Sequence, residues 1–278
     1  MQAPQLTLEH TCDVDRADIG NTQQVAEFAA AICTHLLGSE EQFLPSPYYM
    51  SKQNDINEKM RAILVDWIIE VHLKFKLRPE TLFLTISLID RFLEKTKIMR
   101  TKLQLVGVTA MLIASKYEEI YAPEVRDFVF ITDNAYTKEE IFAMEYSMLS
   151  VLEFSVTTPS AYSFLERFAK VANASLRLWN LARYLIELPL IEQRMLKYSP
   201  SNLAASAIYL ALKIIYRGDG EWTPALTNHS GYSEHQLRAC AKDMCILLAG
   251  IEKCSLQAVR KKFTLQRFME VALIRIEH

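Results

Sequence analysis

The side chains that could carry out chemistry are scattered along this chain, and their spacing assembles no recognisable catalytic site. The six histidines are spread over the whole length, and no His-Glu-x-x-His sequence places two imidazoles on one helical face for a metal. The phosphate-binding loops Gly-x-Gly-x-x-Gly and Gly-Lys-Ser/Thr are absent, and so is the Gly-x-Ser-x-Gly turn of hydrolases. We therefore predict that the chain is not an enzyme and holds no cofactor and no metal.

One adjacent acidic pair, Glu118 and Glu119, has the composition of a general acid–base pair. Adjacent helical residues point about 100° apart, so these two carboxylates are poorly placed to share one substrate. Such pairs are common on protein surfaces. We interpret this pair as a helix end in solvent.

The composition limits the kinds of partner. Lys and Arg total 31 against 33 Asp and Glu, which gives a net charge of −2. A protein that holds a polyanion usually carries an excess of cations to neutralise phosphates, so we predict no nucleic-acid partner. Only 7 glycines occur, which disfavours both nucleotide-binding loops and β-rich folds with tight hairpins.

The sequence also bears on location. The apolar stretches are too short, and too often broken by charge, to cross a bilayer, so we expect no membrane partner. The start, Met1-Gln2-Ala3-Pro4, lacks the basic-then-apolar pattern of a secretory signal. The five cysteines form no Cys-x-x-Cys pair, which is typical of reduced thiols. We therefore expect the chain in the nucleus and cytoplasm.

The elements that position these side chains are all predicted to be helices. Residues 1–20 are polar and aperiodic, and Asn21 is a candidate cap for a helix that ends at Gly38. From Asn57 onward, apolar residues recur at three- and four-residue steps, which is the pattern of one helical face. These residues are Met60, Ile63, Leu64, Trp67, Ile68, Val71 and Phe75.

Four further helices follow the first. Pro79 suits the first turn of a helix. Residues 106–114 are apolar on all sides, which is typical of a helix at the centre of a domain. Thr137 with Glu140 three residues later forms a capping box. The predicted helices run from Pro79 to about Lys95, from Thr101 to Glu118, from near Pro123, and from Thr137 to about Val151.

The pattern then repeats with a shift of 97 residues, which indicates two copies of one five-helix unit. The corresponding residues are Ala110 and Ala207, Ala114 and Ala211, Lys116 and Lys213, Leu84 and Leu181, and Leu88 and Leu185. We therefore predict an all-α fold with two tandem five-helix domains of ordinary size. The predicted parts are an N-terminal arm and helix (1–56), a first domain (57–156), a second domain (157–254) and a short C-terminal helical tail (255–278).

Five blocks of sequence resemble the cyclin box of A- and B-type cyclins, and the overall likeness is nearer to the B type. The blocks are Met60-Arg-Ala-Ile-Leu-Val-Asp-Trp67, Ile89-Asp-Arg-Phe-Leu93, Lys102-Leu-Gln-Leu-Val-Gly107, Ala114-Ser-Lys-Tyr-Glu-Glu-Ile-Tyr121, and Ile131 to Lys138 followed by Met144-Glu145. The resemblance covers roughly Phe43 to Phe263. It implies two cyclin-box domains and a regulatory subunit that binds and activates a cyclin-dependent serine/threonine kinase in the cell cycle, at G2/M and mitosis.

The resemblance implies a kinase-binding site in the first box. In related cyclins, a lysine that ends the third helix and a glutamate of the fifth hydrogen-bond the kinase backbone around its mobile helix. Here these residues are Lys116 and Glu145, and Tyr117, Leu149 and Phe154 match the apolar positions that pack on that helix. The alternative is that Lys116 and Glu145 pair only with each other or with solvent.

The second copy differs at these positions. Lys213 persists, but the position of the glutamate falls near Ala241. Only the first box keeps both charges, as expected if one box docks the kinase in this way. A further pair, Arg61 and Asp90, matches residues that tie the first helix to the second inside the family's box, and we interpret it as structural.

A second site is implied by the same resemblance. A hydrophobic patch of the family captures Arg-x-Leu peptides of substrates and inhibitors, and Glu70, three residues beyond Trp67, could hold the peptide arginine. The alternative is that this apolar stripe is simply core. The matching patch residues are Met60, Ile63, Leu64, Trp67, Leu103 and Gln104.

Some positions depart from the B-type pattern. B-type cyclins can hold a phosphorylated partner in a basic pocket of the second box, but two of its positions here are Glu166 and Trp179, and only Arg183 is basic. No Lys-Glu-Asn or Arg-x-x-Leu degradation signal precedes Met60. The alternatives left open are a scaffold that binds a kinase without activating it and a transcription-type cyclin-box protein, against which the charge balance and missing Cys-x-x-Cys pairs count.

Overall fold

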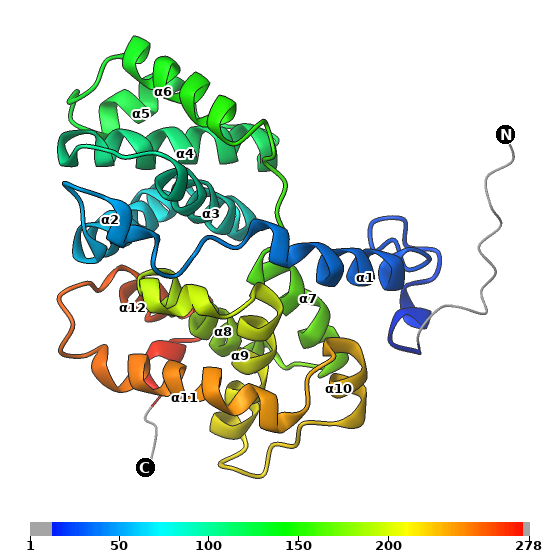
Figure 1. Ribbon diagram of the computed structural model, residues 1–278. Helices are drawn as coiled ribbons and strands as arrows, with labels where there is room; N and C mark the ends of the chain where they lie inside the picture. Colours follow the sequence, from blue (N-terminus) through cyan, green and yellow to red (C-terminus); the bar gives the residue numbers. More distant parts are fainter. Residues whose placement is uncertain (1–12, 275–278) are drawn as a thin grey trace, which may run out of the picture.

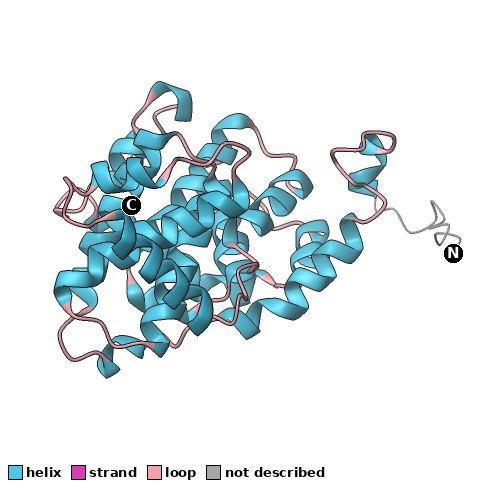
Figure 2. Ribbon diagram, turned by 90° about the horizontal axis from the view of Figure 1, so that it is seen from above, coloured by secondary structure: helices cyan, strands magenta, loops and turns pink. Residues whose placement is uncertain are grey.

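The computed structural model describes residues 13–274, which form helices and loops without a strand (Figure 2). Helices α2–α6 gather in one half of the molecule and α7–α11 in the other (Figure 1). The helices of the first half are α2 (Glu58–Phe75), α3 (Pro79–Lys95), α4 (Leu103–Glu118), α5 (Val125–Ile131) and α6 (Lys138–Val151). Those of the second are α7 (Ala161–Val171), α8 (Leu176–Glu187), α9 (Pro200–Ile215), α10 (Pro224–Ser230) and α11 (Glu234–Gly250).

Helix α1 (Ala29–Ser39) precedes these two groups and α12 (Ala258–Phe263) follows them. The predicted all-α fold, with two tandem five-helix domains between an N-terminal helix and a C-terminal helical tail, is confirmed.

Helix α4 occupies the centre of the first domain, as its apolar sequence predicts. Every residue from Leu105 to Ser115 is buried. Helix α2 packs against it at Gly107, where an added Cβ would lie 2.7 Å from Leu64 Cδ1 and 3.3 Å from Ile68 Cδ1. A side chain there would collide with Leu64, whose side chain would have to move, and this is consistent with a glycine in a helix interior. The helix that carries Lys116 is therefore firmly packed.

The second domain repeats the plan of the first. Helices α5 and α10 have 7 residues each and precede the long helices α6 and α11. Both long helices open with a capping box. The Glu140 carboxylate accepts a hydrogen bond from Thr137 N at 3.0 Å, and the Gln236 amide oxygen accepts one from Ser233 N at 2.8 Å. The repeat predicted from sequence is therefore present in the backbone.

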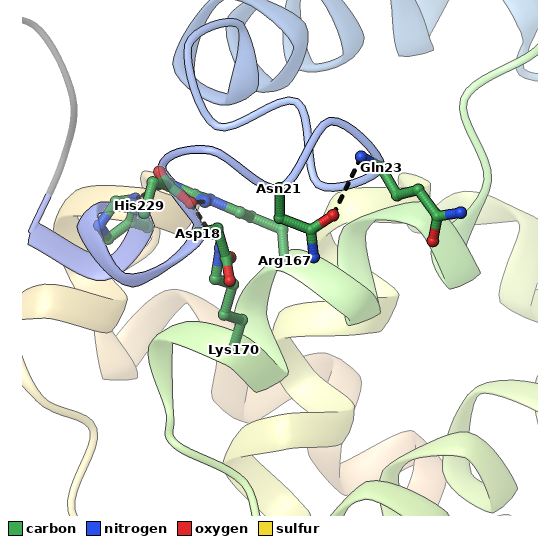
Figure 3. A network of polar contacts seen from close by, with 7 residues as sticks. Asp18, Asn21, Gln23, Arg167, Lys170 and His229 are labelled. Carbon is green, nitrogen blue, oxygen red and sulfur yellow. Dashed lines mark hydrogen bonds and ion pairs between the residues drawn. The ribbon is translucent and has the colours of Figure 1, made fainter. Parts of the chain in front are cut away.

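The predicted helix from Asn21 to Gly38 is wrong at its start, because α1 begins at Ala29. Val25 has a φ of +42°, a left-handed conformation that breaks a helix and that β-branched residues rarely adopt. Asn21 does not cap α1. Its side chain accepts a hydrogen bond from Gln23 N at 3.2 Å, which closes a local turn (Figure 3).

The interpretation of the Glu118–Glu119 pair as a solvated helix end is wrong for Glu119. Its carboxylate accepts hydrogen bonds from Arg78 N at 2.8 Å and from Thr81 Oγ1 at 2.5 Å. These donors lie at the first turn of α3, whose own N-cap residue provides no side-chain hydrogen bond. The end of α4 therefore caps the start of α3.

The segment before α1 is tied to the second domain by an ion-pair cluster (Figure 3). The turn Asp13–Asp18 places the buried Asp15 carboxylate 2.5 Å from Arg167 Nη1 and 2.8 Å from Lys170 Nζ, both on α7. An Arg167 nitrogen also lies 3.4 Å from Nδ1 of His229. Burial opposes the charge of Asp15, but the two cations outweigh it and lower the pKa of this carboxyl.

The other end of α1 is also fixed to the second domain. Glu40 follows α1, and its buried carboxylate accepts hydrogen bonds from Ser201 N at 2.9 Å and Ser201 Oγ at 2.5 Å. Ser201 lies in the first turn of α9, so Glu40 satisfies a backbone group that the helix leaves unpaired. Burial raises the pKa of Glu40. The segment from Asp15 to Glu40, which contains α1, is thereby anchored at two points, although α1 projects from the body of the molecule (Figure 1).

A buried ion pair connects the two domains. Arg61 of α2 donates to the two carboxylate oxygens of Asp90 at 2.6 and 2.7 Å. Its third nitrogen donates to the carbonyls of Leu190 and Ile191, which follow α8, at 2.9 and 3.2 Å. Tyr49 donates to Asp90 at 2.8 Å. Both charged side chains are at most 2% exposed. Burial opposes the charge, but Asp90 outweighs it and raises the pKa of Arg61.

The C-terminal tail packs on both domains. Lys262 of α12 forms a buried ion pair with Glu187 of α8, with both Nζ–O distances 2.7 Å. The Asp66 carboxylate of α2 accepts a hydrogen bond from Ala258 N at 2.9 Å, at the start of α12. Phe263 is fully buried beside them. These contacts fix α12 along α2.

His72 of α2 is buried beside this tail. Its Nε2 lies 2.9 Å from the carbonyl oxygen of Arg78, and since a carbonyl only accepts, Nε2 carries the proton. Burial, followed by the charge of Lys262, lowers the pKa of His72 to about 3. The imidazole is therefore neutral at physiological pH.

None of the helices in residues 13–274 is both long and apolar enough to cross a bilayer. The same residues contain no group of three or more His, Cys, Asp or Glu side chains arranged to hold a metal ion. Cys12 lies outside the described residues, and Cys240, Cys245 and Cys254 are free thiols.

We predict that Asp90→Asn lowers the free energy of unfolding by about 3–5 kcal/mol, because Arg61 would keep a buried charge without its partner. Urea denaturation measures this loss. Asp55→Asn, which breaks an exposed pair with Arg100, is the matched control and should leave the midpoint almost unchanged. The triple change Arg61→Met, Asp90→Leu and Tyr49→Phe should recover part of the loss, because it removes the buried charges and the Tyr49 hydroxyl that bonds to Asp90. Wild-type stability in Asp90→Asn would contradict the role of the pair.

We also predict a pH dependence that originates in His72. Between its unfolded pKa near 6.5 and its folded pKa of about 3, the unfolded chain binds one more proton than the folded chain. The free energy of unfolding should therefore fall as the pH drops below 6.5, by about 1.4 kcal/mol per pH unit from this group. Urea titrations at pH 7, 6 and 5 should show a shallower slope for His72→Gln. The exposed His35→Gln serves as control, and equal slopes for wild type and His72→Gln would refute the assignment.

Candidate functional site

Lys116 and Glu145 lie together on the surface of the first domain. Lys116 is in the last turn of α4, and its Nζ lies 2.7 and 2.9 Å from the two carboxylate oxygens of Glu145 on α6. The lysine side chain is 48% exposed and the glutamate 15%. Mutual pairing is therefore the state of the unbound chain. An ammonium has three donors and a carboxylate about four acceptor positions, so both groups keep bonding capacity for a partner.

Apolar side chains border this ion pair. Tyr117 is 52% exposed and Phe154 69%, whereas Leu149 packs partly against the core. Glu153 and Phe154 have φ values of +54° and +56°, a left-handed conformation that costs on the order of 1 kcal/mol per residue. The resulting turn is closed by a hydrogen bond from Phe154 N to the Leu149 carbonyl at 2.9 Å. It turns the Phe154 ring out toward solvent.

Sequence reasoning missed further exposed apolar residues around the pair. Phe142 precedes Glu145 by three residues on α6, and its ring centroid lies 5.9 Å from Lys116 Nζ. That spacing was a usable signal, because residues three apart share a helical face. Ile120 and Tyr121, in the loop after α4, are 86% and 92% exposed, and no periodicity marks them. So many exposed apolar side chains in one region are typical of an interaction surface.

The second domain offers no comparable pair. Lys213, the counterpart of Lys116, donates to the Gly218 carbonyl at 3.1 Å and so closes the end of α9. Ala241 is buried on α11. The two domains share a backbone plan, but only the first presents a lysine–glutamate pair at this place.

The six predicted patch residues line one open groove between α2 and the start of α4, with a volume of about 310 Å³. Leu64 and Leu103 are buried at its floor, whereas Ile63 is 51% exposed. Part of the stripe is therefore core, and part lines an accessible groove. Arg100 also lines the groove. Sequence reasoning missed Arg100, whose side chain pairs with Asp55 in the loop before α2.

Glu70 is not among the residues that line this groove. It lies one helical turn beyond Trp67 on α2 and is half exposed. Its carboxylate lies 4.0 Å from Lys261 Nζ on α12. The structure therefore places Glu70 outside the groove lining, next to a cation that the sequence does not connect with it.

The positions of the family's phosphate pocket do not form a basic site here. Burial, followed by the charge of Glu80, raises the pKa of Glu166. The Arg183 guanidinium lies 6.0 Å from the ring centroid of Trp179 and 5.3 Å from that of Phe268, so its charge rests against aromatic faces. A carboxyl group and an indole beside one arginine are a poor match for a phosphate.

Two protein-family models match the chain. Residues 31–157 match the cyclin N-terminal domain, and residues 159–277 match the cyclin C-terminal domain.

Two curated relatives illustrate the similarity over the whole length. The "G2/mitotic-specific cyclin-B" of Hydra vulgaris is 45% identical over 262 residues, which is 94% of this chain and 72% of that protein. The "G2/mitotic-specific cyclin-1" of Medicago sativa subsp. varia is 46% identical over 94% of this chain and 60% of that protein. The chain therefore spans between 60 and 72% of the length of these relatives.

Two solved structures resemble the fold. A viral cyclin from herpesvirus saimiri aligns with a TM-score of 0.68 and 20% identity, over 78% of this chain and 97% of that one. A chain of the CAK complex from Chaetomium thermophilum aligns with a TM-score of 0.51 and 14% identity, over 90% of this chain and 84% of that one. At such identities the likeness concerns the fold alone.

Proposed function

This chain belongs to the cyclin family, and we propose on that premise that it is a regulatory subunit of a cyclin-dependent serine/threonine kinase in mitosis. It is not itself an enzyme. Relatives named G2/mitotic-specific cyclin-B, from Hydra vulgaris and Marthasterias glacialis, support the assignment to mitosis. The free thiols in the described residues suit the reducing environment of the nucleus and cytoplasm, where we propose that the chain acts.

The observation that carries the proposal is the Lys116–Glu145 pair with its exposed apolar border. The remaining donors of the ammonium and acceptors of the carboxylate suit backbone groups at the end of a partner helix, which have no intrahelical partner. Charge-assisted hydrogen bonds of this kind fix the register of an interface. Burial of Tyr117, Phe142 and Phe154 would supply most of the affinity.

The proposed mechanism is a shift of the kinase's conformational equilibrium. Catalysis requires an ion pair between a lysine of the kinase and a glutamate on its mobile helix. A subunit that binds only the helix-in conformation of the kinase raises the population of that conformation. A change in the ratio of helix-in to helix-out kinase from 1:99 to 99:1 requires a difference in binding free energy of about 5.5 kcal/mol. Phosphoryl transfer itself stays in the partner.

We further propose that the groove on α2 docks Arg-x-Leu peptides of substrates or inhibitors. The groove is open, its floor is apolar, and Glu70 stands one helical turn beyond Trp67. A leucine side chain fits the apolar part, and an arginine would reach the carboxylate. This docking site is separate from the kinase-binding surface.

We predict that Lys116→Ala with Glu145→Ala lowers activation of a cyclin-dependent kinase at least tenfold, because each charge-assisted hydrogen bond contributes about 1.5–3 kcal/mol. The assay mixes the purified chain with candidate kinases and measures histone phosphorylation. Lys213→Ala is the matched control and should activate like wild type. Thermal melts should show that the double variant remains folded, since it loses only a partly exposed pair. The proposal fails if wild type neither binds nor activates any kinase tested.

For the groove, we predict that Met60→Ala with Trp67→Ala raises the KM for an Arg-x-Leu protein substrate about tenfold, as expected on loss of an aromatic anchor. Phosphorylation of a short peptide without the motif should be unchanged. Met99→Ala, which removes an exposed methionine outside the groove-lining set, controls for surface changes. An equal loss on both substrates would mean that the patch acts only as core.

A further inference from the structure

We propose that Lys261 of the C-terminal helix α12 is a specificity determinant of the docking groove. In the unbound chain its ammonium lies beside the Glu70 carboxylate, and the arginine of a docked peptide competes with it for that carboxylate. This inference rests on the proposed docking function and adds to it a residue from the tail, which lies 191 positions from Glu70 in the sequence.

The position of Lys261 is fixed by its neighbours on α12. Ala258, Val259, Lys262 and Phe263 are all buried, and the ion pair between Lys262 and Glu187 holds the helix against α8. The hydrogen bond from Ala258 N to Asp66 holds its first turn against α2. With these residues anchored, Lys261 lies on the exposed face of α12, within reach of Glu70 on α2.

The charged neighbours of Glu70 include the carboxylate of Asp66 and the ammonium of Lys261. Asp66 lies one helical turn before Glu70, and burial, opposed by its bond to Ala258 N, raises its pKa, with a further increase from the charge of Glu70. The charge of Lys261 acts in the opposite direction on Asp66. Among the described residues, Lys261 is the one cation within ion-pair distance of Glu70, at 4.0 Å. It is therefore the cation with which an incoming guanidinium would compete for Glu70.

The pair is weak enough to be exchanged. The Lys261 side chain is 72% exposed and that of Glu70 51%, and pairs of this kind contribute little. A guanidinium can bind a carboxylate with two parallel hydrogen bonds, whereas an ammonium cannot, so arginine is favoured in the exchange. Displacing Lys261 should weaken peptide binding by about two- to five-fold relative to a groove without it.

The exchange of Lys261 for the peptide arginine at Glu70 also affects how peptide binding depends on salt. When arginine replaces Lys261 at Glu70, one cation takes the place of another, and the local charge balance changes little. Without Lys261, the arginine would meet an uncompensated carboxylate, and binding would respond more strongly to ionic strength. The change of peptide affinity with salt concentration (the salt slope) therefore distinguishes competition between Lys261 and the peptide arginine for Glu70 from an indirect effect of Lys261 on the shape of the groove.

The test measures binding of a fluorescent Arg-x-Leu peptide to the full chain by anisotropy, beside a peptide with alanine in place of the arginine. Lys261→Ala should lower the Kd for the Arg-x-Leu peptide about two- to five-fold and make that Kd depend more steeply on salt. Lys261→Glu should lower the Kd further. Lys253→Ala removes another exposed lysine that precedes α12 and is the matched control. It should leave the Kd unchanged. The Kd for the alanine peptide should be the same for Lys261→Ala and wild type. When Glu70→Gln is added to Lys261→Ala, the gain in affinity for the Arg-x-Leu peptide should disappear.

Two results would overturn the inference, and they are distinguishable. If wild type binds the Arg-x-Leu peptide better than the alanine peptide but Lys261→Ala changes neither Kd nor salt slope, docking stands and the role of Lys261 is lost. If neither wild type nor Lys261→Ala prefers the Arg-x-Leu peptide, the docking function itself is lost together with this inference.

Discussion

The buried ion pair between Arg61 and Asp90 is the interaction on which the rest of the structure depends. Both charges are taken out of water, which is costly unless every donor and acceptor finds a partner. Arg61 meets that requirement only by reaching from α2 to Asp90 on α3 and to the carbonyls of Leu190 and Ile191 after α8. The two domains must therefore be correctly placed relative to each other for Arg61 to form all of these hydrogen bonds. We infer that the pair specifies the arrangement of the two domains more than it adds to their stability.

A fixed arrangement is what the proposed mechanism requires. A subunit that shifts a partner's equilibrium must present its contacts in one geometry, since a surface that adapts to both kinase conformations would favour neither. Lys116 stands at the end of α4, whose residues from Leu105 to Ser115 are buried, and Glu119, three residues later, caps α3. The charged pair thus projects from the most firmly packed part of the first domain. The left-handed turn at Phe154 stores strain at the border of the same surface.

Much of this architecture could be predicted from sequence, because the spacing of apolar residues and the capping residues indicate where helices lie. Thr137 with Glu140 marked the start of α6, and the 97-residue repeat marked the second domain. The failures concern tertiary context. The left-handed conformation of Val25 delays α1, and no local pattern indicates it. The sequence predicts a solvent-exposed Glu119, because the groups that donate hydrogen bonds to its carboxylate lie at the start of α3, about forty positions away. The contact between Lys261 and Glu70 depends on where the tail packs, and sequence spacing carries no information about that.

The central claim is that this chain activates its kinase by selecting the helix-in conformation. The most direct test attaches two spin labels to a partner kinase, one on the mobile helix and one on the rigid lobe, and measures their distance distribution by electron paramagnetic resonance. Saturating wild-type chain should convert a mostly helix-out distribution to a helix-in one. Lys116→Ala with Glu145→Ala, at concentrations that saturate binding, should convert it incompletely. Tight binding of wild type with an unchanged distance distribution would contradict the account and identify the chain as a scaffold.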